Sequence, residues 1–210
     1  MSVYTIEQAA ALLDALEDAP LKYRVGVMLG LLAQMRKGEI AGLNWDDVDF
    51  EHRLLHVRRS ASYVQGSGVV VKEPKTSSGR RTIALPDALL EVMRALRREQ
   101  IADRLRLGET WEDSGAMFTQ WNGARQHPDT IGKWFTGFLK AHDLPHIRFH
   151  DLRHTGASLL FAQRVDVQTI SKRLGHSKTS VTMDIYGHAY SEYDRAAADE
   201  LGANLLRKRG

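Results

Sequence analysis

The sequence contains no cysteine, which excludes a framework of disulfide bonds and any metal site built on thiolate ligands. It also lacks long apolar runs, since no stretch approaches the ~20 consecutive apolar residues that span a bilayer. The start, Met1 to Thr5, lacks the basic and apolar regions of a secretory signal peptide. We therefore expect a cytoplasmic protein with no membrane partner.

Excess charge of either sign is small, because 29 lysines and arginines face 26 aspartates and glutamates among the 210 residues. A net charge of +3 is weak support for a polyanionic partner, but the distribution is uneven. Residues 1–20 carry four acidic and no basic side chains, whereas residues 164–178 carry four basic side chains and one acidic one. This asymmetry predicts that one surface of the protein attracts phosphate groups.

Apolar residues recur at helical spacing through most of the chain, and few prolines interrupt them. Thr5 and Gln8 form a capping-box pattern that predicts a first helix, and Pro20 suits the first turn of a second. A bend at Met35–Lys37 then precedes a short helix over Gly38–Leu43. The same spacing, with glycine and proline at the boundaries, predicts helices from Pro86 to near Gly108 and over residues 129–141, 151–163, 166–174 and 178–185.

Three short runs of β-prone residues interrupt the helical pattern, at Leu54–Val57, Val69–Val71 and Thr82–Leu85. Loops rich in glycine and serine separate them, which predicts a three-stranded antiparallel meander. The expected fold class is therefore α+β and mainly helical, in a single domain with one small sheet. The second loop of the meander places cations at an exposed tip: Lys75, Arg80 and Arg81.

Two pairs of residues carry groups suited to chemistry. His150 and Arg153 are three positions apart at a predicted helix start, so they face the same side of that helix. His176 is followed ten positions later by Tyr186, with one short predicted helix between them. Each group also has an ordinary structural explanation: a solvated surface pair, a residue at a helix C-terminus, and a tyrosine packed at the edge of a core.

Taken together and in this order, these segments resemble the tyrosine recombinase and phage integrase family. Arg36, in a helix bend and followed by Glu39, is similar to the family's first catalytic arginine with its acidic neighbour. The segment Pro74–Arg81 is similar to the β-hairpin that carries the family's lysine, here Lys75. The remaining matches are to the family's HxxR, LGH and nucleophile motifs: His150 and Arg153, His176, and Tyr186.

One departure from the family pattern lies just before Arg36. Where many relatives read Thr-Gly-Leu-Arg, this chain reads Ala33-Gln34-Met35-Arg36. Because glycine adopts backbone conformations that other residues avoid, we expect the turn ahead of Arg36 to differ in conformation. The arginine itself is retained.

The resemblance implies a tyrosine recombinase catalytic-domain fold, with residues 1–210 forming a single catalytic domain. In the family a separate DNA-binding domain typically precedes this one, so we expect the chain to be a fragment. The implied activity is site-specific DNA recombination or integration, in which DNA is cleaved and rejoined through a 3′-phosphotyrosyl intermediate without metal, ATP or cofactor. The implied partner is double-stranded DNA, with a homotetramer on DNA and a monomer when free.

The residue types suit this chemistry. A guanidinium can donate two parallel hydrogen bonds to phosphate oxygens, which fits Arg36 and Arg153. The phenol of Tyr186 has an ordinary pKa of about 10 and needs help to become a nucleophile. The resemblance suggests that His150 and His176 contact the phosphate or accept the phenolic proton, and which of them does more stays open.

The remaining expected roles are a proton donor, an orienting residue and contacts to DNA. Lys75 would be the general acid for the departing 5′ hydroxyl. Glu39 would orient an arginine or His150 rather than act directly. Phosphate contacts are expected from basic side chains near the hairpin and the second histidine: Arg80, Arg81, Lys172, Arg173 and Lys178.

Several alternatives remain open at this point. A metal site could use the four histidines at four-residue intervals, although Pro145 interrupts that spacing: His142, His146, His150 and His154. A DNA-binding module could have kept the fold and lost turnover. A type IB topoisomerase or telomere resolvase would share the active site but not the outcome, and Tyr190 or Tyr193 could replace Tyr186 as nucleophile.

Overall fold

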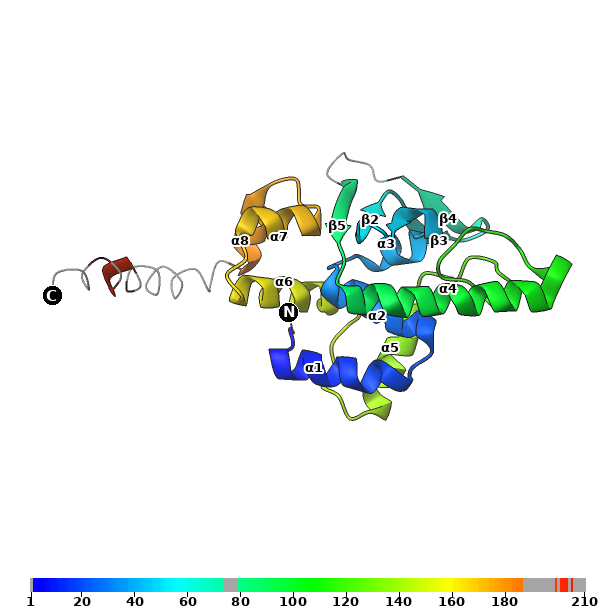
Figure 1. The fold of residues 1–210 in the computed structure, drawn as a ribbon, viewed down its shortest axis with the longest axis horizontal. Helices are drawn as coiled ribbons and strands as arrows, with labels where there is room; N and C mark the ends of the chain where they lie inside the picture. The colour runs from blue at the N-terminus through cyan, green and yellow to red at the C-terminus, as the bar shows by residue number, and fades with distance from the viewer. Residues whose placement is uncertain (1, 74–78, 187–198, 200, 204, 206–210) are drawn as a thin grey trace.

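Helices make up most of this protein, whose structure is a computed structural model that describes residues 2–73, 79–186, 199, 201–203 and 205 (Figure 1). For residues 184–186 the backbone alone is described. The α-helices are α1 (Ile6–Ala15), α2 (Leu21–Leu32), α3 (Lys37–Gly42), α4 (Asp87–Leu107), α5 (Thr130–Ala141), α6 (Asp151–Ala162), α7 (Val167–Leu174) and α8 (Thr179–Tyr186). Short 3-10 turns follow or precede some of them: η1 (Leu16–Asp18), η2 (Trp45–Asp47) and η4 (Gly108–Thr110).

The helix predictions are confirmed, with boundaries that move by one or a few residues. The capping box at Thr5 is present, since its hydroxyl accepts from the backbone of Gln8 and the Gln8 side chain accepts from the backbone of Thr5. Pro20 lies directly before α2 as its N-cap residue. Local capping and boundary chemistry therefore fix where these helices begin.

The helix α2 lies at the centre of the molecule and contacts α3, α4, α5 and α6. Its residues from Val25 to Leu31 are all buried, as expected for a helix that is apolar on every side. In Figure 1, α4 runs past α2 with the strands on one side of it and α1 and α5 on the other. The C-terminal end of α2 leads into the turn that carries Arg36.

The three-stranded sheet differs from the predicted meander. Its strands are β1 (Val48–Asp49), β2 (Leu54–Val57) and β5 (Arg81–Ala84), in the antiparallel order β1-β2-β5. The run at Val69–Val71 is not part of it, so the predicted meander was wrong in its middle strand. That run belongs to β4 (Gly68–Lys72), which pairs with β3 (Ser60–Val64) in a separate two-stranded sheet.

Helix α3 packs directly against the backbone of β3. A Cβ atom added to Gly42 would lie 3.0 Å from the backbone nitrogen of Ala61, and one added to Gly38 would lie 2.7 Å from the Ser60 hydroxyl. Side chains at these two positions would push the helix and the strand apart. The two glycines, one helical turn apart, therefore allow this close approach.

Helices α7 and α8 pack against each other at the end of the described fold. Asp166 caps the start of α7 by accepting from the backbone of Thr169, and Gly175 ends the helix in the left-handed conformation at φ 65°. Ala157, Ile170 and Leu174 form a small apolar cluster that joins α6 to α7. None of the helices among the described residues is long and apolar enough to cross a membrane.

Candidate active site

Three segments that are far apart in the sequence meet at the buried side chain of Arg153, which is 2% exposed. Its Nη1 donates to the carbonyl of Gln34 at 2.6 Å, and its Nη2 donates to the carbonyl of Leu174 at 2.5 Å. The same Nη2 lies 3.3 Å from Nε2 of His176. One guanidinium on α6 thus connects the turn after α2 with the end of α7.

His176 is held in one tautomer by its two neighbours. A guanidinium can only donate, so Nε2 of His176 accepts from Arg153 and Nδ1 carries the proton. That Nδ1 lies 2.9 Å from the hydroxyl oxygen of Thr182 on α8, to which it donates. Burial, followed by the charges of Arg153 and Arg36, lowers the pKa of His176 to about 4, so its ring is neutral at pH 7.

Arg36 is the N-cap residue of α3 and is oriented by Glu39, three residues later. The Glu39 carboxylate accepts from the backbone nitrogen and from Nη1 of Arg36, each at 2.9 Å. It also accepts two bonds from Arg81 on β5, at 2.9 and 2.8 Å. The side chain of Arg36 remains 41% exposed, which leaves part of its guanidinium open to a ligand.

The carboxylate of Glu39 is buried yet ionised. Burial acts to raise the pKa of Glu39, but the hydrogen bonds and charges of Arg81 and Arg36 outweigh it and lower the pKa to about 2. Glu39 therefore keeps a full negative charge between two guanidinium groups at any pH near neutrality. The orienting role of Glu39 stays a prediction, which these bonds support.

His150 lies at the N-cap position of α6, with its ring 5.0 Å from that of His154 at an interplanar angle of 82°. Partial burial, followed by the charge of Arg153, lowers the pKa of His150, and Arg36 adds to the effect. Burial and the neighbouring His150 likewise lower the pKa of His154. Both rings are therefore neutral at physiological pH and able to accept a proton.

The basic residues expected to contact DNA fall into two groups. Arg81 is bonded to Glu39 and donates from Nε to the carbonyl of Arg173 at 2.7 Å, with a side chain only 6% exposed. Arg173 donates from Nε to the side chain of Gln34 at 2.8 Å and from Nη2 to a carbonyl of α2. These two side chains thus hold protein elements together, whereas the other three are exposed: Arg80, Lys172 and Lys178.

Several residues of interest lie outside the described part of the structure. Lys75, Tyr190 and Tyr193 are among them, and for Tyr186 the structure gives only the backbone position at the end of α8. Among the described residues, no group of three or more histidine or acidic side chains is arranged to hold a metal ion. Of the four histidines considered for such a site, His142 instead contacts the carbonyl of Phe138 at 3.0 Å.

The turn before Arg36 uses a left-handed backbone conformation although it has no glycine. Gln34 follows the end of α2 with φ at 50°, in the region that glycine adopts without strain. Its side chain is 2% exposed and donates from Nε2 to the carbonyls of Leu31 and Leu32, each at 2.9 Å. Those carbonyls belong to the last turn of α2, where no backbone partner is available within the helix.

Residues 3–192 match the sequence profile of the phage integrase family. The chain belongs to the phage integrase family. The match covers the whole region that contains Arg36, the HxxR pair, His176 and Tyr186. The recognition of the family from the order of these motifs is therefore confirmed.

Proteins of similar sequence include a recombinase-like protein and an integrase. The chain is 29% identical over 212 residues to a tyrosine recombinase XerC-like protein of Caldanaerobacter subterraneus subsp. tengcongensis, covering 96% of this chain and 54% of that protein. It is 28% identical over 201 residues to the ICEBs1 integrase of Bacillus subtilis, with 96% and 54% covered. The chain thus spans about half the length of these relatives.

Solved structures of integrases share the fold. The Tn1549 transposon integrase in complex with transposon right end DNA superposes with a TM-score of 0.80 at 22% identity, covering 96% of this chain and 66% of that one. The XerA recombinase does so with a TM-score of 0.69 at 20% identity, covering 100% of this chain and 66% of that one. The predicted mainly helical α+β fold of a recombinase catalytic domain is confirmed.

Sequence reasoning missed the roles of four contributors to this site. Arg81 and Arg173 were interpreted as DNA contacts, and Gln34 only as the loss of a glycine. The sequence carries no local signal for their roles, because the partners of Arg81 and Arg173 are 42 and 139 positions away from them in the chain. Thr182, which fixes the tautomer of His176, could have been suspected from its place between His176 and Tyr186.

Proposed function

We propose that this chain is the catalytic part of a site-specific recombinase that cleaves and rejoins double-stranded DNA through a 3′-phosphotyrosyl link to Tyr186. The observation that carries the proposal is the convergence of Arg153, His176 and the Arg36 turn at one place. Membership of the phage integrase family supports it, as does the DNA bound to the Tn1549 transposon integrase in its solved structure.

The first requirement of the reaction is a fixed positive charge around the phosphate. Arg153 is oriented by two main-chain carbonyls, and Arg36 is oriented by Glu39, so neither guanidinium needs to be ordered when DNA arrives. Preorganised donors of this kind stabilise the charge that develops on the phosphoryl oxygens. Loss of one of them would lower the rate roughly 10²- to 10³-fold.

The second requirement is movement of protons between oxygen atoms. As the phenol oxygen of Tyr186 bonds to phosphorus, the bond from phosphorus to the 5′ oxygen breaks, and the phenolic proton passes to a neutral histidine. His150 and His176 are both neutral at pH 7, because burial and nearby arginines lower their pKa values. The acceptor nitrogen of His176 is already bonded to Arg153, so His150 is the better placed acceptor. Lys75 would supply the proton that the departing 5′ oxygen takes up. The reverse reaction rejoins the strand, with no metal or nucleotide among the reactants.

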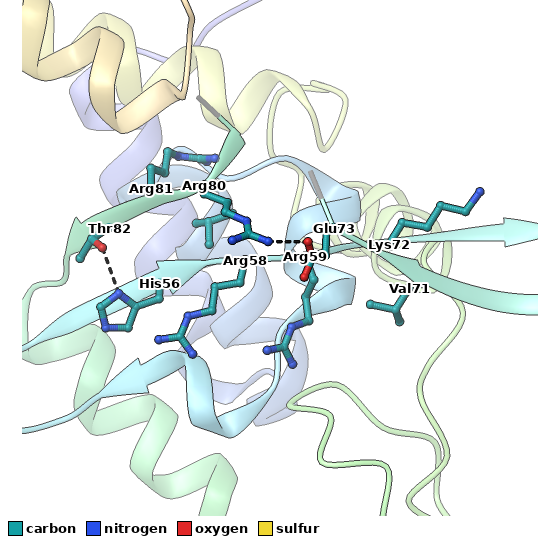
Figure 2. Close-up of a pocket in the computed structure, with 10 residues that line it drawn as sticks. His56, Arg58, Arg59, Val71, Lys72, Glu73, Arg80, Arg81 and Thr82 are labelled. Carbon is teal, nitrogen blue, oxygen red and sulfur yellow. Dashed lines mark hydrogen bonds and ion pairs between the residues drawn. The ribbon is translucent and has the colours of Figure 1, made fainter. Parts of the chain in front are cut away.

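A basic hollow beside the site offers a path for the DNA backbone. It has a volume of about 620 Å³ and lies between the two sheets (Figure 2). Arg58 and Arg59 extend from the connection between β2 and β3, although Arg59 is paired with Asp46 and Asp47. We assign phosphate contacts to the exposed cations of this hollow and of the α7 end: Arg58, Lys72, Arg80, Lys172 and Lys178.

The decisive experiment uses a nicked suicide DNA substrate, from which the cleaved strand escapes so that the covalent complex accumulates. The chain should form a DNA adduct that survives a denaturing gel, and peptide mapping should place it on Tyr186. Tyr186→Phe should form none, whereas the matched variants Tyr190→Phe and Tyr193→Phe should form it normally. An adduct formed by Tyr186→Phe would refute the assignment.

A second assay separates recombination from DNA relaxation. Substrates with two recombination sites should yield exchanged products, while a topoisomerase-like relative would only relax supercoiled DNA. The tetramer on DNA and the monomer in its absence stay predictions, which sedimentation of the chain with and without two-site DNA would test. The cytoplasmic location also stays a prediction.

A further inference from the structure

Gln34 stands where three elements of the site meet, although its side chain touches none of the groups assigned to the reaction. Its own carbonyl accepts from Nη1 of Arg153, and its side-chain Oε1 accepts from Nε of Arg173. Its Nε2 donates to two carbonyls at the end of α2. A single residue thus joins the ends of α2 and α7 to the guanidinium on α6.

The link through Arg173 leads back to the same guanidinium. Arg173 precedes Leu174, whose carbonyl accepts from Nη2 of Arg153, and His176 lies two residues further along. Displacement of Arg173 would therefore move both the second acceptor of Arg153 and the histidine beside it. Gln34 controls the first acceptor through its backbone and the second through its side chain.

The surroundings of Gln34 are too closely packed for the side chain to choose another position. A Cβ atom added to Gly156 of α6 would lie 2.0 Å from the carbonyl oxygen of Leu31 and 2.9 Å from Nε2 of Gln34. Helix α6 therefore approaches the end of α2 with no side chain between them, directly over the amide of Gln34. The close contact between α2 and α6 therefore allows the Gln34 amide a single orientation in which it makes all its hydrogen bonds.

The backbone of Gln34 shows that a glutamine is costly at this position. Its φ of 50° is a conformation that residues with a Cβ atom adopt with strain and that glycine adopts freely. A residue of this kind persists where its surroundings over-determine it. Here those surroundings are the hydrogen bonds of the amide to Leu31, Leu32 and Arg173.

We propose that Gln34 is a positioning residue, which couples the ends of α2 and α7 and thereby holds Arg153 and His176 in the geometry that the reaction needs. This inference rests on the proposed phosphotyrosyl reaction for its kinetic consequence. Its structural content, the coupling of Arg173 to the turn before Arg36, is independent of that reaction.

The test is the variant Gln34→Gly, which keeps the left-handed backbone and the carbonyl but removes the amide. The rate constant for adduct formation on a suicide substrate should fall at least about tenfold, toward the roughly 100-fold that a displacement of ~1 Å can cost. Affinity for DNA should change little, while the melting temperature should fall, because relief of strain at this φ only partly offsets the loss of the buried hydrogen bonds of the amide. A loss of stability without any displacement of Arg153 and His176 would lower the amount of active protein and leave the rate constant unchanged.

Asp143→Gly is the matched control. Asp143 also has a positive φ, at 52°, but is exposed after α5 and away from the site. It should relieve similar strain and leave the rate constant for adduct formation unchanged. A second comparison combines Gln34→Gly with Arg173→Lys: if both act through one link, the double variant should be no slower than the slower single variant.

Nuclear magnetic resonance of the arginine side chains provides a measurement that does not depend on activity. The Nε proton of Arg173 should be protected from solvent exchange in the parent chain and lose that protection in Gln34→Gly, with a shift in the signals of Arg153. If the parent chain forms no adduct, the proposed function fails and these signals alone decide the role of Gln34. Unchanged arginine signals, or an unchanged rate constant in Gln34→Gly, would overturn the inference.

Discussion

Replacing Glu39 with glutamine would remove the negative charge that Arg36 and Arg81 share. The Glu39 side chain is 7% exposed, and both arginines donate to it. Removing one partner of a buried ion pair typically costs about 3–5 kcal/mol, because the remaining charges are left without a counterion. We therefore expect Glu39→Gln to fold with a clearly lower free energy of unfolding.

The lowered pKa of Glu39 gives a second measure of the same quantity. Its pKa falls from the ordinary 4.5 to about 2 in the folded protein. This difference corresponds to about 3 kcal/mol of stability at neutral pH. Because the folded pKa is the lower one, the unfolded chain binds the proton first on acidification. The contribution is complete well above pH 4.5 and is lost as the pH falls toward about 2.

Urea unfolding of both proteins at several pH values tests this reasoning. The difference in the free energy of unfolding between the parent chain and Glu39→Gln should be about 3 kcal/mol at pH 7. It should shrink by roughly 2 kcal/mol by about pH 3, because most of the linkage lies between the two pKa values. Glu91→Gln on the exposed side of α4 is the matched control and should show neither effect. A Glu39→Gln difference that stays constant across this pH range would refute the argument.

Three further outcomes are expected. Gly156→Ala should lower the free energy of unfolding by about 2–3 kcal/mol in the same urea titration, because its Cβ would lie 2.0 Å from the Leu31 carbonyl oxygen. Gly137→Ala on α5 has open space around its Cβ and should raise the free energy of unfolding by about 0.5–1 kcal/mol. The pKa of His176 is lowered to about 4, so the neutral ring stabilises the fold fully above pH 6.5 and this contribution is lost as the pH falls toward 4. The variant His176→Asn should therefore lose less stability than the parent chain between pH 6.5 and pH 4. Equal losses would contradict this. Arg80→Ala should reduce the slope of log affinity for DNA against log salt concentration by about 1, and an unchanged slope would remove Arg80 from the DNA contacts.

The helices could be predicted because their signals are local. Thr5 and Gln8 mark the start of α1 within four residues of sequence, and Gly175 marks the end of α7 by adopting the left-handed conformation. Capping and periodicity act between residues one turn apart, so they survive the folding of the rest of the chain. The same is true of the short helix α3, which Arg36 precedes as its N-cap residue.

The pairing of the strands was predicted incorrectly, because two of the strands, β1 and β3, were not recognised in the sequence. Val69–Val71 is β-prone, but its partner β3 begins with the small residues Ser60, Ala61 and Ser62, so its strand signal is confined to two residues at its end. The two-residue strand Val48–Asp49 is too short for any pattern. The prediction of one three-stranded sheet therefore joined strands that belong to two sheets.

The candidate site also contains residues that short motifs predict and residues whose roles depend on the fold. Arg153 and His176 were predicted from short motifs, and the structure brings them within hydrogen-bonding distance. The roles of Arg81 and Arg173 depend on where Glu39 and Gln34 come to lie, which no motif specifies. A basic residue next to a motif looks the same in the sequence whether it faces DNA or holds two helices together.

The backbone contact between α3 and β3 has a consequence for the segment between β4 and β5, which contains Lys75. This segment leaves β4, which pairs with β3, and β3 in turn packs against Gly42 of α3. It rejoins the fold at Arg81, which is bonded to Glu39 of the same helix. Both ends of the segment are thus connected to one six-residue helix, α3, whose N-cap residue is Arg36. Any shift of that helix would carry Arg36 and both ends of this segment together, so the position of the arginine is coupled to the two points between which the segment is held.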